Sequence, residues 1–194
     1  MVASDVTSVP LVHQGTPSEV LARITDLGSC AMLAFDGDRH IGQLQFRRYE
    51  PGTRSTSGVW DPHYWMDFGN RAPALPPDTL CVCCYHVGQL DDSPERDGRY
   101  QGRGIGARLL QALLDWARAR EFAALIAKGA PSNREVMRFL GGLPEPAYRA
   151  RGFETVVTWR DKDLERVVRQ RRLAGKEVIG AASTVACCVL RMSP

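Results

Sequence analysis

A glycine-rich segment, Gln101–Gly106, carries the residues best suited to chemistry in this sequence. Apolar residues then repeat at helical spacing over 105–117, so the segment opens an amphipathic helix. Glycines let a backbone approach a bulky ligand and leave amide N–H groups exposed. The start of a helix adds a partial positive charge, which predicts a phosphate or diphosphate site. A tight turn that only begins the helix is the alternative.

Two nucleotide sites use glycines of this kind, and the sequence disfavours both. Gly102, Gly104 and Ala107 match the spacing of a dinucleotide-binding fold. That fold needs a strand that runs directly into the glycines, whereas a polar loop at 91–98 follows the strand-like run 79–87. A P-loop is excluded because no Gly-Lys-Ser/Thr follows. Because of Ala107, a nicotinamide-dependent oxidoreductase stays open as an alternative.

Two motifs point to one family. The segment Gln101–Gly106 resembles the pyrophosphate loop, Gln/Arg-x-x-Gly-x-Gly/Ala, of the GCN5-related N-acetyltransferases (GNAT). Tyr148–Phe153 resembles the Tyr-x-x-x-Gly-Phe that closes the last helix of that family, and the resemblance covers residues 79–159. It implies an α/β (α+β) fold, with a mixed, mostly antiparallel central sheet, a splayed strand pair and flanking helices. It also implies acetyl-CoA as the co-substrate.

The resemblance implies roles for particular residues. The diphosphate of acetyl-CoA is expected at the glycine segment, and the backbone of the strand at residues 85–87 is expected to bind the pantetheine arm. Asn133 lies further from Tyr148 than in the family pattern, because 141–146 interrupts the last helix. The cofactor-binding residues predicted in this way are Tyr85, His86, Val87, Gln101, Gly102, Arg103, Gly104, Ile105, Gly106, Ala107 and Asn133.

Acetyl transfer to an amine needs few groups. Tyr148 is the predicted proton donor to the departing thiolate, because a phenol with a pKa of about 10 stays protonated at neutral pH. His86 is the candidate general base, since imidazole titrates near neutrality. His63, Asp61 and Asp67 are further candidates. A water chain, or an amine that arrives neutral, would serve equally well.

An irregular stretch, residues 50–77, holds aromatic residues among Gly, Pro and Ser. Aromatic groups are normally buried, so this stretch is expected to be ordered, with one short strand at 64–68. The acceptor is expected to enter here, as a primary amine of a small molecule or peptide with an apolar part. The predicted substrate-binding residues are Trp60, His63, Tyr64, Trp65 and Phe68.

Six cysteines, at positions 30, 81, 83, 84, 187 and 188, lie in apolar, strand-like segments. This placement indicates buried, reduced thiols and a cytoplasmic protein. Cys81 and Cys84 have a ligand-like spacing, but residues three apart in a strand point to opposite faces. Cys187 and Cys188 are adjacent, so their side chains also diverge. No metal site is predicted.

Caps and periodicity predict the remaining elements. Thr16, Pro17 and Glu19 begin a helix that Gly28 ends, and 30–35 pairs with 40–48 as a hairpin. Further strands are predicted at 79–87, 122–127, 153–159 and 184–191, and further helices at 132–141, 144–151 and 161–173. Ser132 and Glu135 form the expected capping box of the first of these helices.

Length and charge set broad limits. A chain of 194 residues suits one domain, 1–194. The net charge of +3 does not favour nucleic acid, and no apolar run has the length of a membrane helix. The alternative to an enzyme is a coenzyme-A-binding protein without catalysis, because no base is obvious and the last helix is interrupted. The oligomeric state stays open, with a homodimer as one option.

Overall fold

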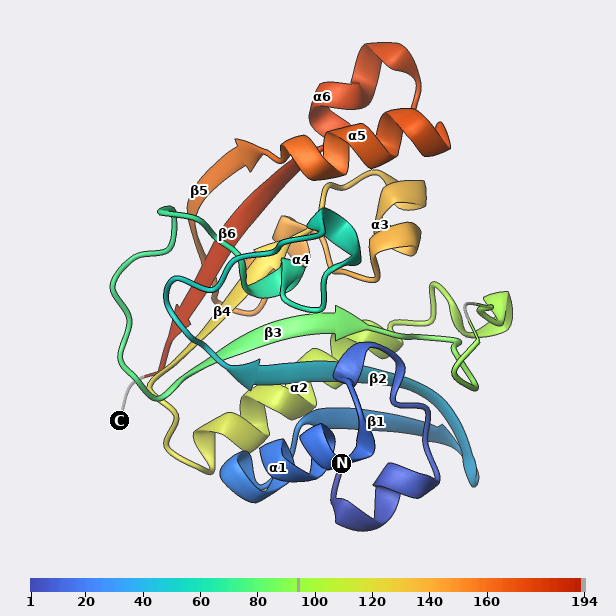
Figure 1. Cartoon of the computed structure of the whole chain (residues 1–194), viewed down its shortest axis with the longest axis vertical. Helices are drawn as coiled ribbons and strands as arrows, with labels where there is room; N and C mark the ends of the chain where they lie inside the picture. The colour runs from blue at the N-terminus through green and yellow to red at the C-terminus, as the bar shows by residue number, and fades with distance from the viewer. Residues whose placement is uncertain (94, 193–194) are drawn as a thin grey trace.

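The computed structural model describes residues 1–93 and 95–192; Pro94, in the predicted polar loop, and the last two residues lie outside this range. A six-stranded sheet has the order β1-β2-β3-β4-β6-β5 (Figure 1). Only β3 and β4 run parallel to each other. The strands are β1 (Ala31–Asp36), β2 (Arg39–Arg48), β3 (Thr79–Tyr85), β4 (Ala124–Gly129), β5 (Glu154–Arg160) and β6 (Thr184–Arg191). The mixed, mostly antiparallel sheet is thereby confirmed, and it differs from the parallel sheet of a dinucleotide-binding fold.

Helices cover both faces of the sheet. In Figure 1, α2 lies behind β1 to β3, whereas the N-terminal residues and the stretch 50–77 cross the front. The α-helices are α1 (Pro17–Leu27), α2 (Ile105–Arg118), α3 (Arg134–Leu140), α4 (Glu145–Arg149), α5 (Lys162–Arg171) and α6 (Ile179–Ala182). No helix within 1–93 or 95–192 combines the length and the apolar character needed to cross a bilayer.

Several predicted caps are confirmed. The Thr16 side chain accepts from the Glu19 amide, Pro17 opens α1, and Gly28 ends it in the left-handed region. Asp161 accepts from the amides of residues 163 and 164 at the start of α5.

Two local predictions are wrong. The cap expected at Ser132 lies one residue later, at Asn133, whose side chain accepts from the Val136 amide, so α3 begins at Arg134. The strand expected at 64–68 is a short 3-10 helix, Tyr64–Met66. Carboxylates take up the amides of this stretch locally: Asp61 accepts from residues 56, 57 and 63. These side-chain bonds occupy backbone amides of the stretch and compete with pairing to a neighbouring strand.

A bulge in β3 decides where the cysteines point. The pairs Leu44↔Tyr85 and Phe46↔Val82 leave one extra residue on β3. Tyr85 therefore packs toward α2, while Cys81 and Cys84 join one buried cluster on the opposite face. The prediction that these two cysteines face opposite ways is wrong for this reason. The expectation of buried free thiols is confirmed for all six cysteines.

The parallel strands β3 and β4 separate after a short pairing. Their register runs from Thr79↔Ala124 to Val82↔Ala127 and then stops. The connector between α3 and α4, residues 141–144, lies in the gap. The Tyr85 amide donates to Gly141 O at 2.8 Å, and the Ala130 amide donates to Leu143 O at 2.8 Å. The strands are thus splayed, but the chain bridges the opening with its own backbone.

Gly88 connects β3 to the loop that precedes the glycine segment. Its amide donates to Ile41 O at 2.8 Å, and its carbonyl accepts from the Asp97 amide at 2.7 Å. Its φ is +81°, and an added Cβ would lie 2.5 Å from Asp97 O. We expect Gly88→Ala to lower the free energy of unfolding by roughly 2–5 kcal/mol, because left-handed strain and overpacking add. Urea unfolding measures this loss.

Gly52 offers a matched control, since its φ is +89° and no atom lies within 4 Å of an added Cβ. Gly52→Ala should lower the free energy of unfolding only by the backbone strain, about 1–2 kcal/mol. Equal losses in the two variants would contradict the role assigned to the Gly88–Asp97 contact.

Candidate active site

The glycine segment forms an open cradle of amides. Gly102 and Gly104 have φ of +74° and +71°, and no atom lies within 4 Å of a Cβ added at either. Gly104 is also the N-cap of α2. The N–H groups of residues 102–107 have no hydrogen-bond partner among the described residues. Unpaired amides at a helix N-terminus form an anion site, so the turn is built to face a ligand.

A cavity of about 550 Å³ opens at this cradle. Three arginines line it: Arg96, and Arg134 and Arg138 from α3. No Asp or Glu of the described part of the chain lines it. An anionic ligand therefore meets positive charge from two directions. Of the predicted cofactor residues, those that line the cavity are Tyr85, Val87, Gln101, Gly102, Gly104, Ile105, Gly106 and Ala107.

The strand backbone offers fewer free groups than predicted. The His86 amide donates to Gln43 O at 2.9 Å, and the Tyr85 amide is taken by Gly141. Only Val87, of these three, has an amide without a partner in the described chain, and Val87 lines the cavity. The expectation that all three backbones bind pantetheine is therefore not met in this conformation.

Three predicted cofactor residues lie outside the cavity lining: His86, Arg103 and Asn133. The Asn133 side chain caps α3 and lines a different cavity. Arg103 is exposed, with its guanidinium 6.0 Å from the centre of the Tyr100 ring.

The two tyrosines near the cavity form a pair. The Tyr148 hydroxyl donates to the Tyr85 hydroxyl at 3.4 Å. Burial raises the pKa of both phenols, so both stay protonated at neutral pH. Tyr148 is 1% exposed and lines neither cavity, whereas Tyr85 lines the first. Of the two tyrosines, Tyr85 is therefore the one that lines the cavity.

His86 is a poor general base. Burial lowers its pKa to about 3, with Arg96 as a second cause. The ring is 1% exposed and lies on the face of β3 away from the glycine cradle. A base that works near neutrality needs a pKa close to the working pH. The catalytic role predicted for His86 is therefore not supported.

The predicted acceptor residues do not form one pocket. Tyr64, Trp65 and Phe68 are buried in the core, and none of the five residues lines either cavity. Trp60 is exposed and meets Phe139 edge to face at 5.3 Å. His63 pairs with Asp61 at 3.3 Å.

The aromatic residues enclose a lysine of the chain itself. Lys128 Nζ donates to Tyr64 O at 2.6 Å and lies 3.9 Å from the centre of the Tyr64 ring. Burial lowers the pKa of this ammonium to about 8. The stretch 50–77 thus covers β4 as part of the core.

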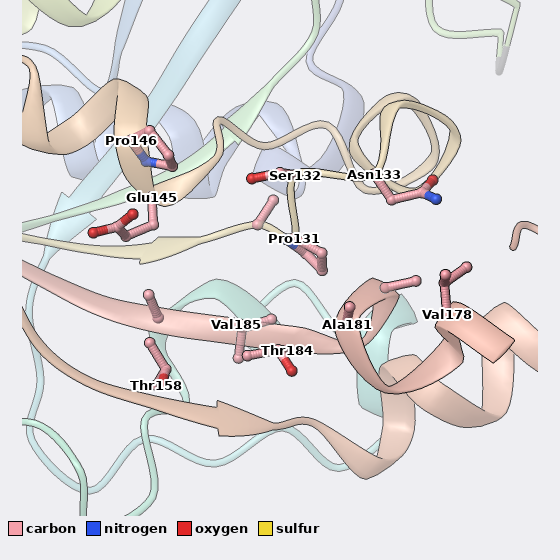
Figure 2. A pocket seen from close by; sticks show the side chains of 13 residues that line it. Pro131, Ser132, Asn133, Glu145, Pro146, Thr158, Val178, Ala181, Thr184 and Val185 are labelled. Atoms are coloured by element: carbon pink, nitrogen blue, oxygen red, sulfur yellow. The ribbon is translucent and has the colours of Figure 1, made fainter.

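A second cavity, of about 420 Å³, lies between the segment 130–133 that follows β4, the strand β6 and the helix α6. Glu145 lies at one end and Val178 at the other, with Ser132 and Asn133 between them (Figure 2). Glu145 is the one ionisable residue among the described residues that line it. The connector 141–144 lines the first cavity, and the first turn of α4 lines the second. This short stretch of chain therefore separates the two cavities.

Sequence reasoning missed several residues of the first cavity, including Arg96, Arg134, Arg138 and the connector. Arg134 and Arg138 are four apart in a predicted helix, so one face of that helix is basic. That signal could have indicated a phosphate-facing surface. No sequence signal indicated that the connector enters the gap between β3 and β4.

The sequence matches the Acetyltransferase (GNAT) family over residues 9–141. The chain belongs to this family. The match and the fold together indicate an N-acetyltransferase, and the GNAT family uses acetyl-CoA. The open amide cradle and the basic cavity wall fit the diphosphate of that co-substrate.

Solved structures show the same fold at low identity. Ribosomal-protein-alanine N-acetyltransferase from Brucella melitensis is 14% identical, with a TM-score of 0.54 over 99% of this chain and 97% of that one. Ard1 from Thermoplasma volcanium is 13% identical, with a TM-score of 0.50 over 100% and 95%. No curated protein sequence matches this GNAT chain.

Proposed function

We propose that this GNAT chain transfers an acetyl group from acetyl-CoA to a primary amine of a small molecule or peptide. The unpartnered amides of residues 102–107, at the mouth of an arginine-lined cavity, carry the proposal. Hydrogen bonds to charged groups contribute about 1.5–3 kcal/mol each, so a few converging amides account for micromolar binding.

Calorimetry with acetyl-CoA, followed by thiol release across a panel of amines, tests this function. Binding of acetyl-CoA at micromolar concentration and turnover with at least one amine are expected. NADH should not compete. Absence of acetyl-CoA binding would contradict the proposal outright.

Two groups of the chain are proposed to assist acetyl transfer, one from the backbone and one from a side chain. The Val87 amide is the free backbone donor available to a thioester carbonyl. Tyr85 is the proposed proton donor to the departing thiolate, because its hydroxyl accepts from Tyr148 and keeps its own O–H for the cavity. Tyr148 then acts as a positioning residue. No His, Asp or Glu among the described residues lines the first cavity, so the amine arrives neutral or loses its proton to water.

The acceptor is proposed to bind in the second cavity, where Glu145 is the single carboxylate. Thr155 Oγ1 donates to this carboxylate, and the exposed Arg149 lies 3.6 Å away. Glu145→Gln should raise the KM for the amine about tenfold and leave acetyl-CoA affinity unchanged, since one charged contact is lost at an open site. Steady-state kinetics with varied amine measures the change.

Glu154→Gln removes an exposed carboxylate outside the cavity lining and should leave the KM unchanged. An equal rise in both variants would indicate a general charge effect instead of an acceptor contact at Glu145.

One observation favours a second candidate, a coenzyme-A-binding protein without turnover. The backbone bonds from Tyr85 to Gly141 and from Ala130 to Leu143 close the gap that a pantetheine arm would enter. Each such bond contributes only about 0.5–1.5 kcal/mol, and a ligand amide can replace it. We therefore expect the connector to yield to acetyl-CoA. Tight binding with no turnover for any amine would support the second candidate.

A further inference from the structure

A second set of chemistry-bearing side chains lies across β3 from the glycine cradle. Cys84 packs in the cluster that contains the aromatic stretch, and His86, two positions on, points to the same face. His13, from the turn Val12–Gln14, meets His86 edge to face with ring centres 5.2 Å apart. One ligand atom of each of the three residues lies within 4.8 Å of the other two.

The Nε2 atom of His86 has a lone pair available for a ligand. Gln89 Nε2 donates to Ser93 O at 2.6 Å, so Gln89 Oε1 faces the His86 ring and lies 3.0 Å from Nδ1. Nδ1 must then carry the proton, which leaves the lone pair on Nε2. Nε2 is buried and has no partner among the described residues. A buried acceptor left unpaired is unfavourable, and a bound cation would offset that cost.

The backbone holds His13 beside the His86 ring. Val12 has a φ of +52°, in a region that a β-branched residue rarely occupies. Its amide donates to Asp92 Oδ1 at 2.8 Å. Strain of this kind persists only where surrounding contacts fix the conformation, and it is frequent at ligand sites.

We propose that His13, Cys84 and His86 bind one Zn²⁺ ion through two imidazole nitrogens and one thiolate, with the fourth position open to water. Imidazole and thiolate are the ligands that zinc prefers. Tetrahedral zinc holds such atoms about 3.6 Å apart, given Zn–N of about 2.1 Å and Zn–S of about 2.3 Å. The three ligand atoms lie within 4.8 Å of one another, so they must approach by about 1 Å to bind one ion, and His13 is the exposed member of the set.

The residues around the proposed site determine how tightly it should bind zinc. Burial lowers the pKa of both histidines, which keeps the imidazoles in the neutral, ligating form. Burial raises the pKa of the Cys84 thiol, so binding must displace its proton. The nearby Arg96 guanidinium opposes a cation, since it lowers the pKa of both histidines as well. We therefore expect weaker binding than at a closed four-ligand zinc site.

Titration of the chelator-treated full chain with Co²⁺ tests the proposal, because thiolate coordination produces a charge-transfer absorption. One equivalent of Co²⁺ should saturate the band, and one equivalent of Zn²⁺ should remove it. Zn²⁺ at about a hundred times its Kd should raise the Tm by about 5–10 °C. His13→Gln, at an exposed residue that is safe for folding, and Cys84→Ser should both abolish the band.

Two matched variants complete the experiment. His40→Gln removes a buried histidine whose ring nitrogens also have no hydrogen-bond partner within 1–93 or 95–192. Cys188→Ser removes a buried thiol of another strand. Both variants should keep the cobalt band. No band in the unmodified chain, or a band that survives both His13→Gln and Cys84→Ser, would overturn the zinc site. Neither result bears on acetyl-CoA binding, which calorimetry measures separately.

Discussion

Gly104→Val is expected to weaken acetyl-CoA binding by about 10- to 100-fold. Gly104 lines the first cavity, caps α2 and has a φ of +71°. A β-branched residue is strained in that region by about 1–2 kcal/mol, so the backbone either stays strained or leaves the cradle. Loss of one amide contact to a diphosphate costs about 1.5–3 kcal/mol, which corresponds to this range. Calorimetry with acetyl-CoA measures the change in Kd.

The control variant must introduce the same backbone strain at a glycine that lies away from the acetyl-CoA site. Gly52→Val meets this need, because Gly52 has positive φ, has open space around it and lies in the loop after β2. Both variants should lower the Tm by about 2–8 °C. Only Gly104→Val should lose acetyl-CoA affinity. If Gly104→Val binds as tightly as the unmodified chain, the amide cradle is not the diphosphate site.

Tyr85→Phe is expected to lower kcat by about 100-fold or more while the Kd for acetyl-CoA changes little. Tyr85 is the phenol on the cavity wall, and general acid catalysis contributes about 10²–10⁴-fold. Removal of its hydroxyl also leaves the buried Tyr148 hydroxyl without an acceptor, which costs about 1–3 kcal/mol of stability. Kinetics are therefore measured well below the Tm of the variant.

Tyr148→Phe separates direct donation from positioning. If Tyr148 only orients Tyr85, its loss should lower kcat less, by about tenfold, since the Tyr85 hydroxyl remains at the cavity. The KM for acetyl-CoA should stay constant in both variants. A larger loss of kcat in Tyr148→Phe than in Tyr85→Phe would return the donor role to Tyr148. That result would agree with the role that the family motif implies.

The connector 141–144 links these predictions, because it accepts hydrogen bonds from the amides of Tyr85 on β3 and of Ala130 just after β4. Two glycines make its path possible. A Cβ at Gly141 would lie 2.6 Å from Tyr85 O, and the ring of Trp65 would overlap one at Gly142. The aromatic stretch thus supports the bridge between β3 and β4 from the opposite face of the sheet. In this way a core residue, Trp65, influences the coenzyme cavity without lining it.

The sequence by itself determined most of the elements and the glycine segment. Apolar periodicity and caps predicted α1, α2, the hairpin and β6, because these signals lie within a few residues along the chain. The glycine segment was also readable, since its chemistry resides in a backbone that glycine alone leaves free. Together with Tyr148–Phe153 it was sufficient to indicate the GNAT family.

Only the tertiary structure decided which side chains meet. The bulge in β3 turned Cys84 and His86 toward His13, some seventy residues away along the chain. The aromatic stretch became part of the core because it packs over Lys128 and β4 and excludes water from them. The periodicity of the sequence does not show which segment packs there. The connector entered the strand gap because unpaired amides of Tyr85 and Ala130 required acceptors there. Long-range pairing of this kind depends on three-dimensional proximity, which local sequence signals do not encode.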